Sequence, residues 1–189
     1  MLLLRSFADD GAVIGDSRFV GDRRFEESFA QYLSRYGPVI AVADPHQPPQ
    51  RGAARTFLPD ESWQQQVIAW MDKAALIVVL VGSTKGTKWE LGQIISLNYL
   101  DKCVLVVPPT LDQKEQLAGA IEPFLGSRWE SALQDLSACN GLRAFYCRSN
   151  GNVTAFWSRK REAADYLVAL AFCIYGMLCH SRSEGKPTS

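Results

Sequence analysis

One stretch of the chain, Ala75–Val81, is apolar from end to end and reads Ala-Leu-Ile-Val-Val-Leu-Val. A run this rich in β-branched residues is typical of a central strand in a parallel sheet, because both faces of such a strand are buried. A sheet with two buried faces needs a layer of helices on each side. This segment therefore predicts an α/β protein with three layers.

Four further apolar runs are predicted as strands, and segments with helical periodicity separate them. The strands are expected at Leu2–Phe7, Val39–Ala43, Cys103–Val107 and Leu142–Cys147. Helices are expected at about 23–36, 60–73, 87–100, 112–139 with a break near Gly126, and 159–178. Five alternating strands most often form a parallel sheet in the order 2-1-3-4-5. We therefore predict a flavodoxin-like three-layer sandwich with a five-stranded parallel sheet.

The length and charge of the chain fit one domain without a charged partner. The 189 residues predict a single domain over residues 1–180, followed by a disordered tail at 181–189. The 20 basic and 20 acidic residues cancel, so we expect no nucleic-acid partner. The apolar stretch Ala163–Cys179 is too short to span a bilayer and is predicted to be a core helix. We expect a cytoplasmic chain, or the cytoplasmic domain of a membrane-tethered protein.

The cysteines and histidines do not suggest a metal site. Five cysteines occur without a CxxC pair, and the chain has two histidines. We therefore expect no bound metal, and reduced, buried thiols in a reducing compartment.

In the predicted strand order, the ends of the first and third strands meet where the chain reverses its direction of winding. Ligands bind at this crevice in open α/β sheets. Two polar segments fall there, Arg5–Asp10 and Gly82–Glu90. Gly82 and Gly86 let the backbone approach a ligand closely, and the following helix N-terminus favours anions such as a pyrophosphate. The spacing of this second segment differs from that of a Walker phosphate loop, so we exclude a P-loop NTPase.

Glu90 is the sharpest candidate for a catalytic group, although it has a structural alternative. Thr87 and Glu90 fit a capping box, in which the Glu side chain bonds back to the first amide of the helix. A carboxylate that caps a helix can also face a ligand, so the sequence leaves both roles open.

The other polar and aromatic candidates also have alternatives. Trp89 is expected to pack against the sheet, and Trp63 to line either the crevice or the core. Arg5 either contacts a ligand or pairs with an acidic neighbour such as Asp9. Arg55, in a long loop over residues 44–59, either reaches phosphates in a bidentate manner or is solvated.

The same segments carry a resemblance to a known family. Leu4–Asp10, Gly37–Val42, Gly52–Arg55 and Gly82–Leu91 resemble motifs of bacterial Toll/interleukin-receptor-like (TIR-like) domains. More narrowly, they are similar to a group of bacterial proteins that share RSFxDD and GxTxGxxWEL motifs. The resemblance covers about residues 1–110.

This resemblance implies cleavage of NAD+, which is the substrate, without a further cofactor. It implies that Glu90 stabilises the ribosyl cation and that Phe7 or Trp63 stacks on a ring. It further implies that the ribose and phosphates contact Arg5, Ser6, Asp9, Arg55, Trp89 and the Gly82–Gly86 loop with Thr84. TIR-like domains also imply a homo-oligomer. Two alternatives stay open: a non-enzymatic self-association module, and a nucleotide sensor or nucleoside ribosyltransferase-like protein.

Overall fold

The computed structural model describes residues 1–4, 25–42, 54–56, 63–109, 111, 114–137, 141–160 and 162–184. In these residues the helices are α1 (Phe25–Leu33), α2 (Trp63–Lys73), α3 (Lys85–Ser96), η2 (Leu100–Lys102), α4 (Lys114–Ala120), η3 (Glu122–Phe124), α5 (Glu130–Ser137) and α6 (Ala163–Glu184). The strands are β1 (Leu2–Leu4), β2 (Ile40–Val42), β3 (Ala54–Thr56), β4 (Ile77–Leu80), β5 (Cys103–Val106), β6 (Leu142–Cys147) and β7 (Val153–Trp157).

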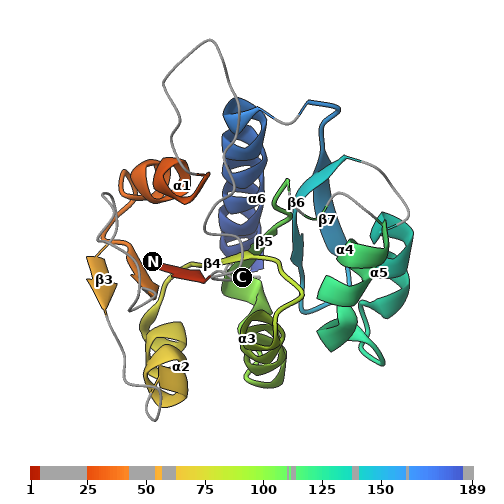
Figure 1. Ribbon diagram of the computed structural model, residues 1–189, viewed down its shortest axis with the longest axis horizontal. Coiled ribbons are helices and arrows are strands. Elements are labelled where there is room, and N and C mark those ends of the chain that lie inside the picture. The colour runs from red at the N-terminus through yellow and green to blue at the C-terminus, as the bar shows by residue number, and fades with distance from the viewer. Residues whose placement is uncertain are drawn as a thin grey trace, which may run out of the picture.

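The strands form one mixed sheet in the order β3-β2-β1-β4-β5-β6-β7 (Figure 1). The α/β class is confirmed, and the five predicted strands (β1, β2, β4, β5 and β6) lie in the predicted relative order. The strands from β3 to β5 are parallel to their neighbours, whereas β6 and β7 each pair antiparallel. The prediction of five strands, all parallel, is therefore wrong.

The antiparallel end of the sheet follows from the connection before β6. Two short helices, α4 and α5, replace a single crossover helix, and the chain begins β6 at the edge of the sheet where β5 ends. This is visible in the hydrogen bond that the amide of Val107 donates to the carbonyl of Arg143, at 2.9 Å. A tight turn then joins β6 to β7, with Gly151 at a φ of +91°. A short turn of this kind joins antiparallel strands, so β7 extends the sheet as a hairpin.

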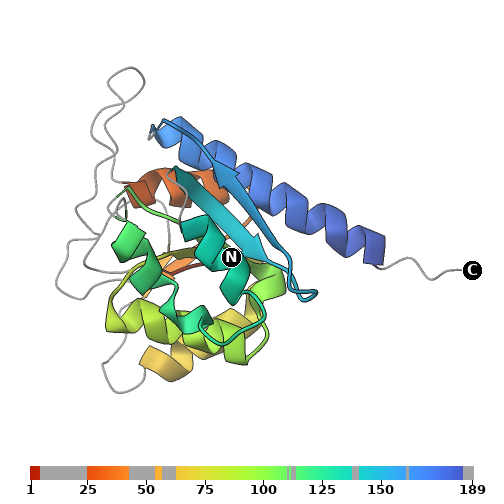
Figure 2. The same ribbon diagram turned by 90° about the vertical axis from the view of Figure 1, so that its right-hand side faces the viewer.

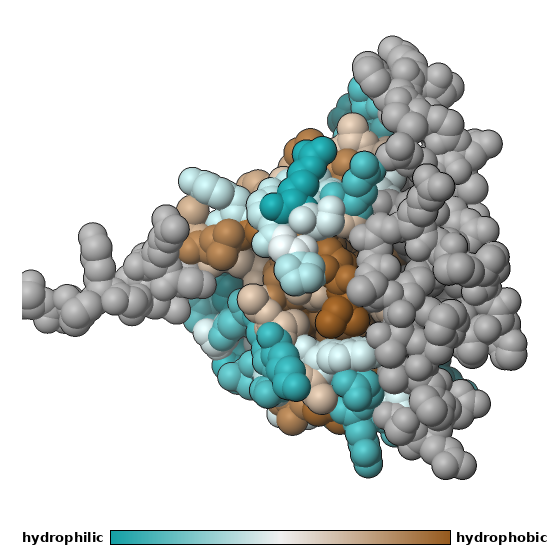
Figure 3. Space-filling view, turned by 90° about the vertical axis from the view of Figure 1, so that its left-hand side faces the viewer, coloured by the Kyte–Doolittle hydropathy of each residue, from teal (hydrophilic) through white to brown (hydrophobic). Residues whose placement is uncertain are grey.

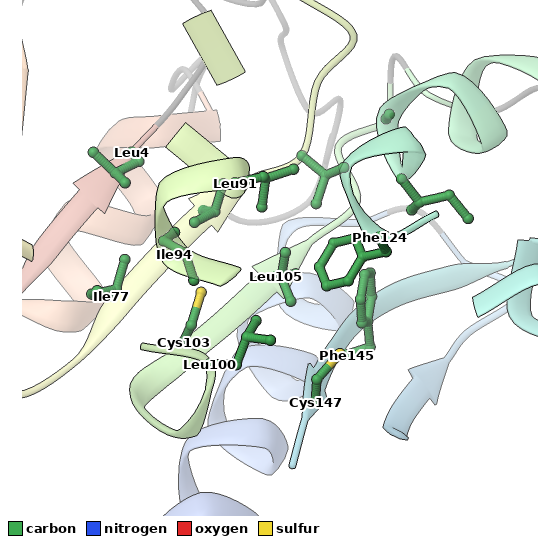
Figure 4. Close-up of a cluster of buried hydrophobic side chains, with 14 of the residues drawn as sticks. Leu4, Ile77, Leu91, Ile94, Leu100, Cys103, Leu105, Phe124, Phe145 and Cys147 are labelled. Carbon is green, nitrogen blue, oxygen red and sulfur yellow. The ribbon is translucent and has the colours of Figure 1, made fainter. Parts of the chain in front are cut away.

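Helices cover both faces of the sheet, and alternate residues of each central strand contact opposite layers. Leu4, Ile77 and Val79 pack with α2 and α3, as Figure 4 shows for Leu4 and Ile77 beside Leu91 and Ile94. Intervening residues such as Leu3, Val78 and Leu80 pack with α1 and α6. Figure 3 shows the face at the β3 end, where hydrophobic side chains gather at the centre of the described surface between more hydrophilic ones.

Two helix boundaries differ from the prediction. The third helix begins at Lys85 rather than Thr87, which changes the interpretation of Glu90 below. The last helix continues to Glu184, so Ser181–Glu184, predicted as part of a disordered tail, are helical. Among the described residues, no helix is both long enough and apolar enough to cross a membrane.

Candidate functional site

The strands β1 and β4 are neighbours in the sheet, as the predicted strand order requires. Leu4 pairs in register with Val79, so the two parallel strands end side by side. The chain winds away from this junction in both directions, through β2 on one side and β5 on the other. The junction is therefore the topological switch point, where open α/β sheets bind ligands. The segment Gly82–Glu90 leads from the end of β4 into α3 at this place.

Thr84 caps the N-terminus of α3. Its backbone is extended, with φ −68° and ψ 155°, and its hydroxyl oxygen accepts a hydrogen bond from the amide of Thr87 at 3.3 Å. The hydroxyl groups of Thr84 and Thr87 are also 3.0 Å apart and share a hydrogen bond. Threonine is a preferred N-cap residue because its oxygen satisfies an amide that has no partner within the helix.

The capping box predicted for Thr87 and Glu90 is therefore wrong. Two threonines stand three residues apart in this segment, and the earlier one takes the cap position. Thr87 then occupies the third position of the helix, and Glu90 lies one turn further in. The carboxyl of Glu90 is left without the capping role that the sequence suggested.

Glu90 lies on the face of α3 that packs against the sheet. The buried residues of this helix are Thr87, Glu90, Leu91 and Ile94, at the spacing of a single helix face. Glu90 is 6% exposed, and its Oε2 atom has no hydrogen-bond partner within the part of the chain that the structure describes. A carboxyl group thus occupies a position that the helix pattern would assign to an apolar residue.

Burial determines the electrostatics of this carboxyl group. Loss of solvation raises the pKa of Glu90 to about 8, because the charged form is disfavoured away from water. A buried polar atom without a partner destabilises a fold, and buried groups with a shifted pKa are often found at ligand-binding and catalytic sites. A cation close to Oε2 would favour the ionised form of the carboxyl. Glu90 would therefore carry a negative charge when such a cation is bound.

Two predicted site residues, Trp63 and Trp89, contact one another. Their ring centroids are 4.8 Å apart, with an angle of 65° between the planes. Trp63 is the first residue of α2, and Trp89 precedes Glu90 in α3, so the pair connects the N-terminal ends of these helices. Both rings are partly buried against the core. The packing predicted for Trp89 is therefore confirmed, and this member of the pair directly precedes Glu90 in the sequence.

The glycines and the lysine of this segment have distinct environments. Gly82 is buried between β4 and the Thr84 cap. Among the residues that the structure describes, none has an atom within 4 Å of a Cβ placed at Gly86, so none of them fills the space beside the first turn of α3. The ammonium of Lys88 forms an ion pair with Glu122 of η3 and is held on that side of the helix.

The remaining predicted site residues are Arg5, Ser6, Phe7, Asp9 and Arg55. Arg5, Ser6, Phe7 and Asp9 lie outside the described residues. The backbone of Arg55 belongs to β3, in register with Ala41 of β2, which puts β2 between it and β1. In the structure, Thr84 caps α3 and Glu90 lies within this helix, while the rings of Trp63 and Trp89 are in contact.

The buried hydroxyl of Thr87 was missed by the sequence interpretation. The signal was available, because Thr87, Glu90, Leu91 and Ile94 form an i, i+3, i+4, i+7 series. With Thr84 as the N-cap, Thr87 lies inside the helix and joins this buried series. Within the described residues, no group of three or more His, Cys, Asp or Glu side chains could hold a metal ion.

Comparisons with protein-family models, with curated proteins and with solved structures found no match to this chain.

Proposed function

We propose that the chain cleaves NAD+ between its ribose and nicotinamide, releasing nicotinamide and ADP-ribose or a cyclic form of it. Glu90 is the carboxyl group at the reacting centre. The observation that carries this proposal is the buried Oε2 atom without a partner, on the sheet-facing side of α3 at the switch point. The resemblance to TIR-like domains in Gly82–Leu91 suggests the substrate.

The chemistry needs one negative charge and little else. When the bond breaks, its electron pair leaves with the nicotinamide nitrogen, and the cationic pyridinium becomes a neutral base. The positive charge moves to the ribose, which forms an oxocarbenium-like centre as in glycoside hydrolysis. Water then attacks this centre and loses a proton to the solvent, whereas in the cyclic case the lone pair of an adenine ring nitrogen attacks instead. A carboxylate fixed beside the ribose lowers the energy of the cation, and the neutral leaving group needs no general acid.

The raised pKa of Glu90 is compatible with this role. In the free protein the carboxyl is mainly protonated at neutral pH, since its pKa is about 8. The pyridinium of bound NAD+ brings a positive charge into a poorly solvated site, which lowers the pKa of a neighbouring carboxyl. The negative charge therefore develops when the substrate is present.

The neighbouring groups could bind the rest of the dinucleotide. The N-terminus of α3 favours a phosphate, although the amide of Thr87 is already bonded to Thr84, and no described residue fills the space beside Gly86. Trp63 and Trp89 provide apolar surface for a ring. In the alternative of a non-enzymatic self-association module, the motifs would survive as structural features, and Glu90 would be expected as a helix cap. Because Thr84 caps α3, a capping role does not explain the buried carboxyl of Glu90, which supports the enzymatic proposal.

The proposal is tested by the loss of NAD+ and the release of nicotinamide, separated by chromatography, at high protein concentration. We expect release by the wild type and at least a hundredfold less by Glu90→Gln, which keeps the shape and removes the charge. Glu162→Gln, a matched change just before α6, should behave as the wild type. Equal activity of Glu90→Gln would assign the chemistry to another group. No release by the wild type would refute the enzymatic proposal.

A further inference from the structure

Gly86 and Glu90 are neighbours on the surface of α3. Residues four apart in an α-helix lie on one face, and each side chain tilts toward the helix N-terminus, so the side chain of Glu90 is directed toward Gly86. Among the described residues, no atom, those of Glu90 included, lies within 4 Å of a Cβ placed at Gly86. We call this space the Gly86 gap. It adjoins a carboxyl group that is 6% exposed and whose Oε2 atom has no partner among the described residues.

An aromatic pair borders the Gly86 gap. At about 100° per residue, Gly86 lies between Trp89 and Glu90 around the helix axis. The ring of Trp89 contacts that of Trp63 at a centroid distance of 4.8 Å. Figure 2 shows α2, which begins at Trp63, and α3 on one side of the sheet, with α6 on the other. A carboxyl group beside aromatic rings is a combination that favours an organic cation.

The first turn of α3 provides an anion site next to the gap. The hydroxyl and the carbonyl of Thr84 accept hydrogen bonds from the amides of Thr87, at 3.3 Å, and Lys88, at 3.0 Å. The amides of Lys85 and Gly86 have no partner in the part of the chain that the structure describes. Acidic residues are favoured in a first turn, but this one has none and carries the exposed Lys85. These amides, the lysine and the positive end of the helix together favour a phosphate group.

The cation site and the anion site are about one helix turn apart. Glu90 follows Gly86 by four residues, a rise of roughly 6 Å at about 1.5 Å per residue. In a 5′-phosphorylated ribosyl pyridinium, the cationic nitrogen on C1′ and the phosphate on C5′ stand at the two ends of one ribose, a separation of similar size. Both charges of such a ligand would therefore meet a complementary group within one turn of α3. Neither contact needs the adenylate group of NAD+.

We propose that nicotinamide mononucleotide, the part of NAD+ that carries the pyridinium, the ribose and its 5′-phosphate, is sufficient as a substrate. This inference rests on the proposed reaction at Glu90. The bond between C1′ and the nicotinamide nitrogen breaks, its electron pair leaves with the nitrogen, and the oxygen of a water molecule bonds to C1′. The products are nicotinamide, ribose 5-phosphate and a proton released to the solvent. Nicotinamide riboside, which lacks the phosphate, meets only the carboxyl half of the site.

The first test compares nicotinamide release from NAD+, nicotinamide mononucleotide and nicotinamide riboside by the wild type. We expect kcat/KM for the mononucleotide to lie within about tenfold of that for NAD+. The riboside should be roughly a hundredfold worse or more, because it loses several charge-assisted hydrogen bonds. A mononucleotide cleaved roughly a hundredfold more slowly than NAD+, or a riboside cleaved as fast as the mononucleotide, would overturn the inference and leave cleavage of NAD+ intact.

Variants test whether the phosphate lies at the first turn of α3. Gly86→Ala places a methyl group in the gap, so kcat/KM for the mononucleotide should fall by roughly tenfold or more, while the midpoint of urea unfolding does not fall because alanine favours a helix. Gly92→Ala, later in α3, also adds a Cβ without a described atom within 4 Å and should behave as the wild type.

Lys85→Gln should lower kcat/KM for the mononucleotide about tenfold and leave that for the riboside unchanged. Lys73→Gln, at the exposed end of α2, should change neither value. Unchanged cleavage of the mononucleotide by both Gly86→Ala and Lys85→Gln would contradict the placement of the phosphate.

A binding measurement separates this inference from the reaction. Ribose 5-phosphate and ribose are compared as ligands of the whole chain by saturation-transfer NMR. We expect a signal for ribose 5-phosphate that is lost in Gly86→Ala, and none for ribose. Binding of this kind without cleavage of NAD+ would refute the proposed reaction, and with it cleavage of the mononucleotide, but retain the phosphate contact. No binding of ribose 5-phosphate, or equal binding by Gly86→Ala, would refute the phosphate contact whether or not NAD+ is cleaved.

Discussion

Replacement of Glu90 by glutamine should stabilise the protein, and more so as the pH rises. The pKa of this carboxyl is about 8 in the folded chain, against an ordinary value of 4.5. Between these two values the folded state holds a proton that the unfolded state has released. Folded Glu90 therefore binds more protons, and the free energy of unfolding falls as the pH rises. This loss of folding stability begins near pH 4.5 and is complete above pH 8.

The magnitude follows from the shift in pKa. One unit corresponds to about 1.4 kcal/mol, so the wild type should lose up to about 1.4 kcal/mol per pH unit through this window. Over the whole window of about 3.5 pH units the loss from Glu90 amounts to roughly 5 kcal/mol, which is a large part of the stability of a typical domain. Glutamine at position 90 has nearly the same shape and carries no charge at any pH. The stability of the variant therefore does not fall with pH through this group.

The assay is urea unfolding followed by tryptophan fluorescence at pH 5, 6, 7 and 8. We expect the stability of Glu90→Gln relative to the wild type to increase with pH, whereas Glu162→Gln should follow the wild type. All other titrating groups are common to the three proteins and cancel in the comparison. Wild-type and Glu90→Gln profiles that run parallel would refute the raised pKa. A variant that is less stable than the wild type at pH 8 would show that Glu90 is ionised and paired in the folded chain.

Two further predictions concern the same site. The kcat/KM for NAD+ should rise about tenfold per pH unit up to about pH 8 and then level off, because the free protein must lose the Glu90 proton; a flat profile between pH 6 and 9 would exclude this carboxyl as the titrating group. Thr84→Ala should lower the free energy of unfolding by about 1 kcal/mol, because the amide of Thr87 loses its cap. Thr84→Asn, which keeps a capping oxygen, should restore most of that stability in the same urea titration, and a neutral Thr84→Ala would show that the cap contributes little.

The centre of the sheet could be predicted because one pattern dominated it. Ala75–Val81 is apolar on both faces, and β4 lies at the centre of the sheet between β1 and β5. The direction of β6 could not be predicted, since an apolar run is the same for a parallel and an antiparallel strand. It depends on the two short helices α4 and α5, of which the sequence suggested only a break near Gly126.

The candidate site was predicted in place but not in detail. The strand order located the junction of β1 and β4, whereas the burial of Glu90 depends on which threonine caps α3. Thr84 and Thr87 are equally good caps by residue type, and only the packed structure distinguishes them. The outer face of α6 could not be predicted either. A helix that is apolar on every side does not indicate from its sequence which side contacts the sheet.

The most direct measurement of the central claim is nicotinamide release from NAD+ at pH 8, with wild type and Glu90→Gln at the same concentration. At this pH about half of the Glu90 side chains are ionised before the substrate binds, so the contrast between the two proteins should be large. The account predicts steady release by the wild type and at least a hundredfold less by Glu90→Gln, although the variant is the more stable protein. Equal release by both would contradict it, because a carboxylate at position 90 would then have no part in the reaction.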